Sequence, residues 1–128
     1  MRYADTSALT KLVLPERESE ALQDYLGANP DLSSSAIAFT ELIRTVRRVR
    51  PQLEPHARRL LLTVNLIVVE DEVLERAAGI QPITVRTLDA IHLATALSLG
   101  RQMEVLLTYD LRMAQAATQI GLPVAMPA

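Results

Sequence analysis

Short apolar runs alternate with helical stretches along the chain, and this order constrains the fold more than any other feature. Apolar runs at 1–4, 66–70 and 105–109 are each followed by segments in which apolar residues recur at helical spacing. The runs are continuous rather than alternating, which is typical of parallel strands covered by helices on both faces. We therefore expect an α/β fold with three α/β/α layers around a central, mainly parallel sheet.

Proline and glycine mark the ends of several helices, as before Pro51 and at Gly100. Ser35 is expected to cap the helix that follows it. The sequence predicts strands over 1–4, 31–35, 66–70, 105–109 and 123–126. It predicts helices over 7–14, 18–28, 36–50, 55–64, 71–79, 87–100 and 111–121.

The composition fits one globular domain over residues 1–128, with 49% hydrophobic and 22% charged residues. A net charge of −2 does not indicate a nucleic-acid binder, and the absence of cysteine excludes thiolate metal sites, thiol nucleophiles and disulfides. Asp5 interrupts the apolar segment that a signal peptide needs, and the longest apolar stretch, 60–69, is too short to span a bilayer. We expect a cytoplasmic protein without membrane association.

Four acids stand at unusual places in this pattern. Asp5 and Asp110 follow predicted strands, at the edge where parallel α/β sheets bind ligands. Glu41 lies among apolar neighbours inside a helix, and Asp89 lies near the start of a mostly apolar helix. Each position also has an ordinary structural explanation, such as a helix cap, a salt bridge from Glu41 to Arg44 or a favourable helix-dipole position.

Convergence of these acids would require a cation. Two carboxylates about 4 Å apart repel by about 1 kcal/mol in water and about 4 kcal/mol near a protein surface. Oxygen ligands without cysteine favour Mg²⁺ or Mn²⁺ over zinc. Such an ion can lower the pKa of water and hold a phosphate for in-line attack.

Four segments carry a family resemblance that spans nearly the whole chain. The sequences "YADTSAL", "TELIRTVRR", "RTLDAIHLATAL" and "LLTYDLRMAQAA" resemble the PIN-domain family, and more narrowly the VapC-type toxins of bacterial toxin–antitoxin pairs. The resemblance implies that four acids are catalytic, with Asp5, Asp89 and Asp110 as metal ligands and Glu41 as the fourth acidic position. It also implies supporting roles for the hydroxyls of Thr6, Ser7 and Thr108.

The resemblance further implies a metal-dependent endoribonuclease. Water activated by Mg²⁺ or Mn²⁺ would hydrolyse an RNA phosphodiester and leave 5′-phosphate and 3′-hydroxyl ends. The implied partners are an RNA substrate, a small VapB-like antitoxin and a second copy of the chain in a homodimer.

Two arginines follow Glu41 along one helical face. Arg44 and Arg48 lie three and seven residues after it, so they can form a phosphate-binding edge. They can equally be solvated cations near the end of a helix, where they complement its dipole.

Arg86 and Arg112 flank Asp89 and Asp110 in the sequence, where they can contact RNA or neutralise the acids. His92 lies one turn after Asp89, which suggests a general base. A packed, hydrogen-bonded histidine that supports its helix is the favoured interpretation.

Other classes remain as alternatives. A catalytically silent, PIN-like metal-binding or interaction module would bind a partner without cutting RNA. A receiver-like or phosphatase-like domain would use Asp5 as a nucleophile, but such designs normally need a second acid close by, where this chain has Thr6 and Ser7. A dinucleotide-binding fold is disfavoured because only four glycines are present and none forms a glycine-rich loop after the first strand.

Overall fold

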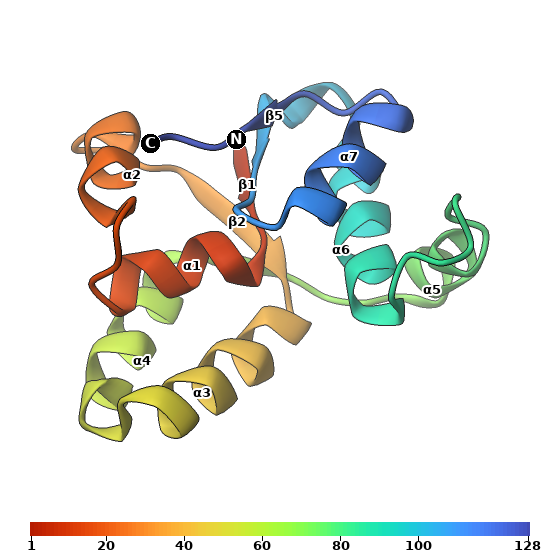
Figure 1. Ribbon diagram of the computed structural model, residues 1–128. Coiled ribbons are helices and arrows are strands. Elements are labelled where there is room, and N and C mark those ends of the chain that lie inside the picture. Colours follow the sequence, from red (N-terminus) through yellow and green to blue (C-terminus); the bar gives the residue numbers. More distant parts are fainter.

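A five-stranded sheet forms the centre of the computed structural model, which describes residues 1–128 (Figure 1). The strand order is β3-β2-β1-β4-β5, and every neighbouring pair is parallel. The predicted fold class is confirmed, and the sheet is parallel throughout. The strands are β1 (Arg2–Ala4), β2 (Leu32–Ser35), β3 (Asn65–Ile67), β4 (Val105–Leu107) and β5 (Val124–Ala125).

Helices cover both faces of this sheet. Neighbouring strand residues point to opposite faces, so Tyr3 and Leu106 enter one core, whereas Ala4 and Leu107 enter the other. None of the helices is both long enough and apolar enough to cross a membrane. The α-helices are α1 (Thr6–Val13), α2 (Ser19–Leu26), α3 (Ile37–Val49), α4 (Glu54–Thr63), α5 (Asp71–Ala78), α6 (Thr87–Ser98) and α7 (Leu111–Gln119); Pro51–Leu53 and Gly100–Gln102 form short 3-10 turns.

The two core clusters divide the helices into layers. The larger cluster joins α1, α2, α3 and α4 to one face of the sheet, and the smaller one joins α6 and α7 to the other, with α5 packed on α6. Figure 1 shows α1, α3 and α4 on one side of the strands, with α6 and α7 on the other. The expected α/β/α layering is confirmed.

The carboxyl edge of the central strands positions the polar residues. The backbone N–H of Asp5, directly after β1, donates to the carbonyl of Leu107 at the end of β4. Asp110 follows β4 by three residues and begins α7. Segments far apart in the sequence therefore meet where β1 and β4 end.

Strand β3 starts one residue earlier and ends three residues earlier than the predicted strand over 66–70. It ends at Ile67, and Val68 is 68% exposed, because this edge strand is covered less completely than the central ones. Strand β2 also departs from the apolar pattern, since Ser33, Ser34 and Ser35 are buried. Hydrogen bonds satisfy them: the Ser34 hydroxyl, for example, donates to the Ala4 carbonyl at 2.6 Å.

Helices α1, α2, α3 and α4 each start one residue away from the predicted position. Helix α1 begins at Thr6, with Asp5 as its N-cap. The Ser35 hydroxyl accepts a weak 3.3 Å hydrogen bond from the Ile37 N–H, but the N-cap position of α3 belongs to Ala36. Ser35 therefore supports the turn before α3 but does not occupy the N-cap position.

Candidate active site

Asp5 is both a helix cap and a buried acid. Its side chain is 3% exposed and accepts the Ala8 N–H at 3.1 Å, which caps α1. The hydroxyls of Ser7 and Thr108 donate to its two carboxylate oxygens. Burial raises the pKa of Asp5, and these hydrogen bonds offset the rise only in part. The structural and functional explanations of Asp5 are therefore compatible.

Glu41 faces this site from α3. Its Oε1 accepts the Thr6 hydroxyl at 2.6 Å and lies 2.8 Å from Nε2 of His92. Burial raises the pKa of Glu41, but the hydrogen bonds from His92 and Thr6 outweigh it, so the pKa is lowered overall. The alternative salt bridge to Arg44 is wrong, because the carboxylate pairs with His92 instead.

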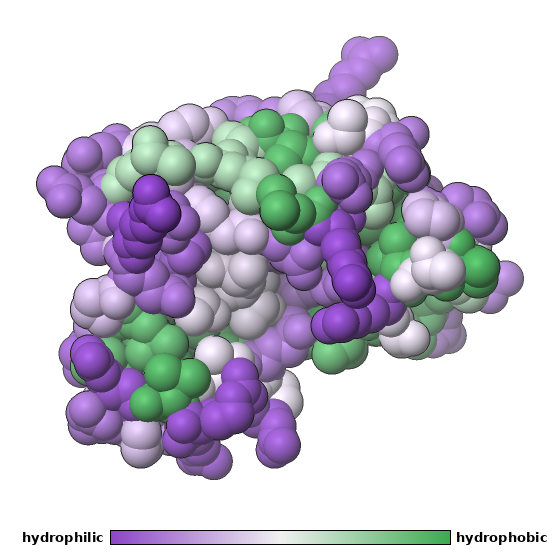
Figure 2. Space-filling view, in the orientation of Figure 1, coloured by the Kyte–Doolittle hydropathy of each residue, from purple (hydrophilic) through white to green (hydrophobic).

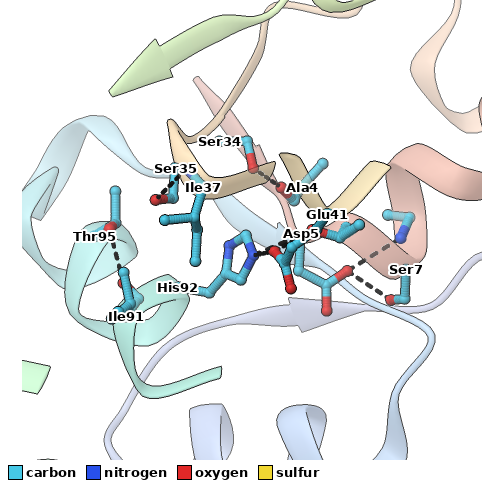
Figure 3. Close-up of polar contacts among 12 residues, drawn as sticks. Ala4, Asp5, Ser7, Ser34, Ser35, Ile37, Glu41, Ile91, His92 and Thr95 are labelled. Carbon is cyan, nitrogen blue, oxygen red and sulfur yellow. Dashed lines mark hydrogen bonds and ion pairs between the residues drawn. The ribbon is translucent and has the colours of Figure 1, made fainter. Parts of the chain in front are cut away.

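His92 links Glu41 to the core (Figure 3). The ring is 1% exposed, and its Nδ1 lies 2.7 Å from the Tyr3 hydroxyl. That hydroxyl already accepts the Ser35 N–H at 3.0 Å, so its own proton is available to Nδ1. This network assigns the ring hydrogen to Nε2, from which it is donated to Glu41. His92 is packed and hydrogen-bonded as expected.

Asp89 and Asp110 complete the acidic set. Burial raises the pKa of Asp89, and the negative charges of Asp110, Asp5 and Glu41 raise it further. Asp89 thus lies within electrostatic range of the other three predicted acids. Asp110 caps α7 by accepting the N–H groups of its second and third residues, and it lines the same hollow as Asp89.

The three predicted hydroxyls connect the acids to the backbone. Thr6 donates to Glu41, whereas Ser7 and Thr108 donate to Asp5. The Ser7 hydroxyl also accepts the Tyr109 N–H at 2.8 Å, and Thr108 accepts the Asp110 N–H at 3.1 Å. These bonds join the ends of β1 and β4, so the hydroxyls hold the carboxylates in place.

The donor chemistry of this site fits a hard divalent cation. Carboxylates and hydroxyls supply only oxygen, and the carboxylate of Asp89 makes no hydrogen bond that would compete for it. No three His, Asp or Glu side chains are arranged closely enough to hold a metal ion. Binding would therefore require carboxylate side chains to move toward the ion.

The predicted arginines form no ion pairs with these acids. Arg86 and Arg112 line the hollow that contains Asp89 and Asp110, yet neither forms an ion pair. Arg44 and Arg48 are exposed on α3 and are also free of ion pairs. For Arg86 and Arg112, RNA contact and neutralisation of the acids therefore both stay predictions.

Comparison with known proteins agrees with this geometry. The family model of the PIN domain matches residues 2–119. The chain belongs to the PIN-domain family. All four acids lie within the matched region of this PIN domain.

The relatives belong to the VapC group. This chain is 42% identical to ribonuclease VapC46 of Mycobacterium tuberculosis, covering 98% of this chain and 96% of the relative. It is 37% identical to ribonuclease VapC47 of the same species, covering 99% and 97%. The PIN domain described here is therefore of the VapC type, as the resemblance predicted.

Solved structures share the fold. A toxin–antitoxin complex from Klebsiella pneumoniae superposes with a TM-score of 0.75 at 25% identity, covering 100% of this chain and 98% of that one. VapC20 of Mycobacterium tuberculosis, a toxin that cleaves the sarcin–ricin loop, superposes with a TM-score of 0.79 at 15% identity, covering 99% and 100%. The latter likeness supports the fold alone.

Sequence reasoning missed Tyr3 as a member of the site. It also placed His92 beside Asp89, whereas the ring bonds to Glu41. Tyr3 and His92 are 89 residues apart, so no local spacing connects them. The only available signal was a tyrosine in the short strand that leads to Asp5.

Proposed function

We propose that this protein is the toxin ribonuclease of a type II toxin–antitoxin pair, and that it hydrolyses RNA phosphodiester bonds with the aid of Mg²⁺ or Mn²⁺. The observation that supports the proposal most is the position of Asp89, whose carboxylate lies within electrostatic range of Asp110, Asp5 and Glu41. Relatives named ribonuclease VapC at 37–42% identity support the same activity.

Asp5, Asp89 and Asp110 would hold the divalent cation. When bound, the ion supplies positive charge that favours ionisation of water and stabilises the charge that develops on the phosphate. Burial raises the pKa of both Asp5 and Asp89, and the neighbouring acids raise that of Asp89 further. A cation removes the repulsion that these positions otherwise carry.

Glu41 is suited to accept a proton or to orient the attacking water. Both of its hydrogen bonds go to Oε1, which leaves Oε2 to accept a hydrogen bond from water. The carboxylate is 24% exposed, so water reaches it, and its lowered pKa keeps it ionised. The buried His92 ring bonds to Oε1 and so fixes the orientation of the Glu41 carboxylate.

The partners follow from the same proposal. A small VapB-like antitoxin would silence the enzyme, in keeping with the structural likeness to a toxin–antitoxin complex. A cytoplasmic location is proposed as well, since the substrate is cellular RNA. A homodimer is proposed from the resemblance to VapC-type toxins. RNA cleavage by the purified protein, with and without divalent cations, tests the proposal directly.

Removal of Arg44 and Arg48 is expected to weaken RNA binding and to flatten its salt dependence. Both side chains are exposed, lack ion pairs and follow Glu41 on α3. Loss of two phosphate contacts lowers the slope of log K against log salt by roughly 1.4 for single-stranded RNA. The measurement is fluorescence anisotropy with Arg44→Ala/Arg48→Ala in an Asp5→Asn background, where RNA stays intact.

The matched control removes the same charge elsewhere. Arg59 on α4 and Arg101 in the turn before β4 are also exposed and unpaired, and Arg101 lies at the opposite edge of the sheet. Arg59→Ala/Arg101→Ala should leave the slope close to that of the parent protein. Equal slopes for the two double variants would show that Arg44 and Arg48 are ordinary solvated cations.

A further inference from the structure

A cavity of about 320 Å³ with a mixed polar and apolar lining lies beside Asp89, between the start of α6 and α7. It adjoins the hollow that contains Asp110, and the two share Arg86, Asp89 and Arg112. Figure 2 shows a hollowed surface between the α3 side and the α6–α7 side, with hydrophilic residues over α7. The cavity is lined by Pro82, Thr84, Val85, Arg86, Asp89, Arg112, Met113, Gln115, Ala116 and Gln119.

The polar side chains of this cavity have no partners within the protein. The side chains of Thr84, Arg86, Arg112, Gln115 and Gln119 are exposed to solvent at the rim of the cavity, and none takes part in a hydrogen bond or an ion pair within the protein. The three on α7 are spaced three and four residues apart, so one face of the helix presents them together. An array of this kind offers donors and acceptors to a ligand.

The charges and the shape restrict the class of ligand. Two guanidinium groups against one carboxylate favour an anion, and guanidinium groups bind phosphate through paired hydrogen bonds. Val85, Met113 and Ala116 add an apolar lining against which a flat ring can lie. The volume is at the lower end of the roughly 300–1,000 Å³ found for ligand pockets, which suits one small ligand or one residue of a polymer.

We infer that this cavity binds one unpaired nucleotide of the RNA substrate, next to the bond that is cut. Arg86 and Arg112 take its phosphate, and the amides of Gln115 and Gln119 bind the edge of its base. The cavity contains no aromatic side chain, so the face of the base lies against the apolar lining. The inference rests on the proposed ribonuclease function and names the residues that select its cleavage site.

A nucleotide uses the whole cavity, whereas other anions use part of it. An acidic side chain of a protein partner would pair with the arginines but leave the amides and the apolar lining without a role. Unpaired bases are read in RNA through hydrogen bonds to their edges, and a primary amide can donate and accept at once. The position beside Asp89 also places the bound phosphate next to the catalytic acids.

The first test maps cleavage sites by sequencing the new 5′ ends in total RNA. Wild type is expected to favour one base at a fixed position beside the cut. In Gln115→Ala/Gln119→Ala this preference should fall about tenfold, the discrimination typical of a paired amide contact. Gln23→Ala/Gln52→Ala removes two exposed glutamines elsewhere and should keep the wild-type preference. An unchanged preference in Gln115→Ala/Gln119→Ala would overturn the inference.

The second test measures binding without cleavage. Short oligoribonucleotides that differ only at the selected base are titrated into Asp5→Asn protein. Adding Arg86→Ala/Arg112→Ala should weaken binding of all of them at least tenfold, whereas adding Gln115→Ala/Gln119→Ala should make their affinities equal. If neither pair alters oligonucleotide binding, the cavity is not a nucleotide site.

The two tests separate this inference from the function on which it rests. Absence of cleavage by wild type would contradict the ribonuclease proposal, whatever the oligonucleotide titrations show. If wild type cleaves RNA and its base preference is unchanged in Gln115→Ala/Gln119→Ala, the ribonuclease proposal is supported and only the assignment of the cavity is contradicted.

Discussion

Asp5→Asn is expected to lower RNA cleavage by at least about a hundredfold, the loss typical when a group that acts in the transition state is removed. The same change should leave the folded protein at least as stable. The substitution is therefore expected to lower activity without lowering stability, as is common where an active site is destabilising for the sake of its function. The measurements are the rate of RNA cleavage and the thermal midpoint in EDTA, with Asp24→Asn on the exposed face of α2 as the control.

The stability prediction follows from the hydrogen bonds of Asp5. An asparagine oxygen can accept from Ser7 and Ala8, and Thr108 can accept from the new amide instead of donating. Asparagine also caps helices about as well as aspartate. The variant loses only a buried negative charge, so a clearly lower midpoint in EDTA would contradict this account.

The pH dependence has a definite sign. Burial raises the pKa of Asp5 in the folded state above its ordinary value of 3.8, so the folded protein binds the proton more tightly than the unfolded chain. Stability is therefore lost as pH rises from that ordinary value through the folded pKa. The variant Asp5→Asn should therefore exceed wild type in stability most at neutral pH, and this difference in stability should shrink as pH falls toward 3.8.

His92→Ala is expected to lower the free energy of unfolding by about 3 kcal/mol or more and to reduce RNA cleavage. The change empties a buried volume and leaves the Tyr3 hydroxyl and Glu41 without their partner. Tyr3→Phe removes only the hydroxyl and should cost about 1–3 kcal/mol, because it leaves Nδ1 of His92 and the Ser35 N–H unpaired. Chemical denaturation measures both.

Matched variants at the surface provide the controls. His56 is exposed on α4, and Tyr25 is 44% exposed on α2 and makes no hydrogen bond through its hydroxyl. His56→Ala and Tyr25→Phe should each change stability by less than about 0.5 kcal/mol. If Tyr3→Phe cost no more than Tyr25→Phe, the hydrogen bonds that connect Tyr3, His92 and Glu41 would not support the site.

Much of the fold could be predicted because the strand–helix alternation is strong and the strands are short and apolar. The four acids could be found because each stands where an acid is unusual, and parallel strands bring their carboxyl ends to one edge. The boundary of β3 could not be predicted, since an apolar run does not reveal how completely an edge strand will be covered. The buried serines of β2 depend on partners from other segments, such as the Ala4 carbonyl.

The connections between the acids could not be read from the sequence. Glu41 and His92 are 51 residues apart, and the sequence suggested the nearer partner, Asp89, instead. The choice between RNA contact and charge neutralisation for Arg86 and Arg112 also depended on side-chain directions. Pairing of this kind is decided by tertiary packing rather than by local pattern.

The most direct measurement is cleavage of total cellular RNA by the purified, antitoxin-free protein in Mg²⁺, Mn²⁺ or EDTA, with Asp5→Asn as the control. The account predicts discrete cuts with 5′-phosphate ends in either metal, and none in EDTA or with the variant. Folded wild-type protein that makes no cuts in either metal would contradict the account and favour a catalytically silent interaction module.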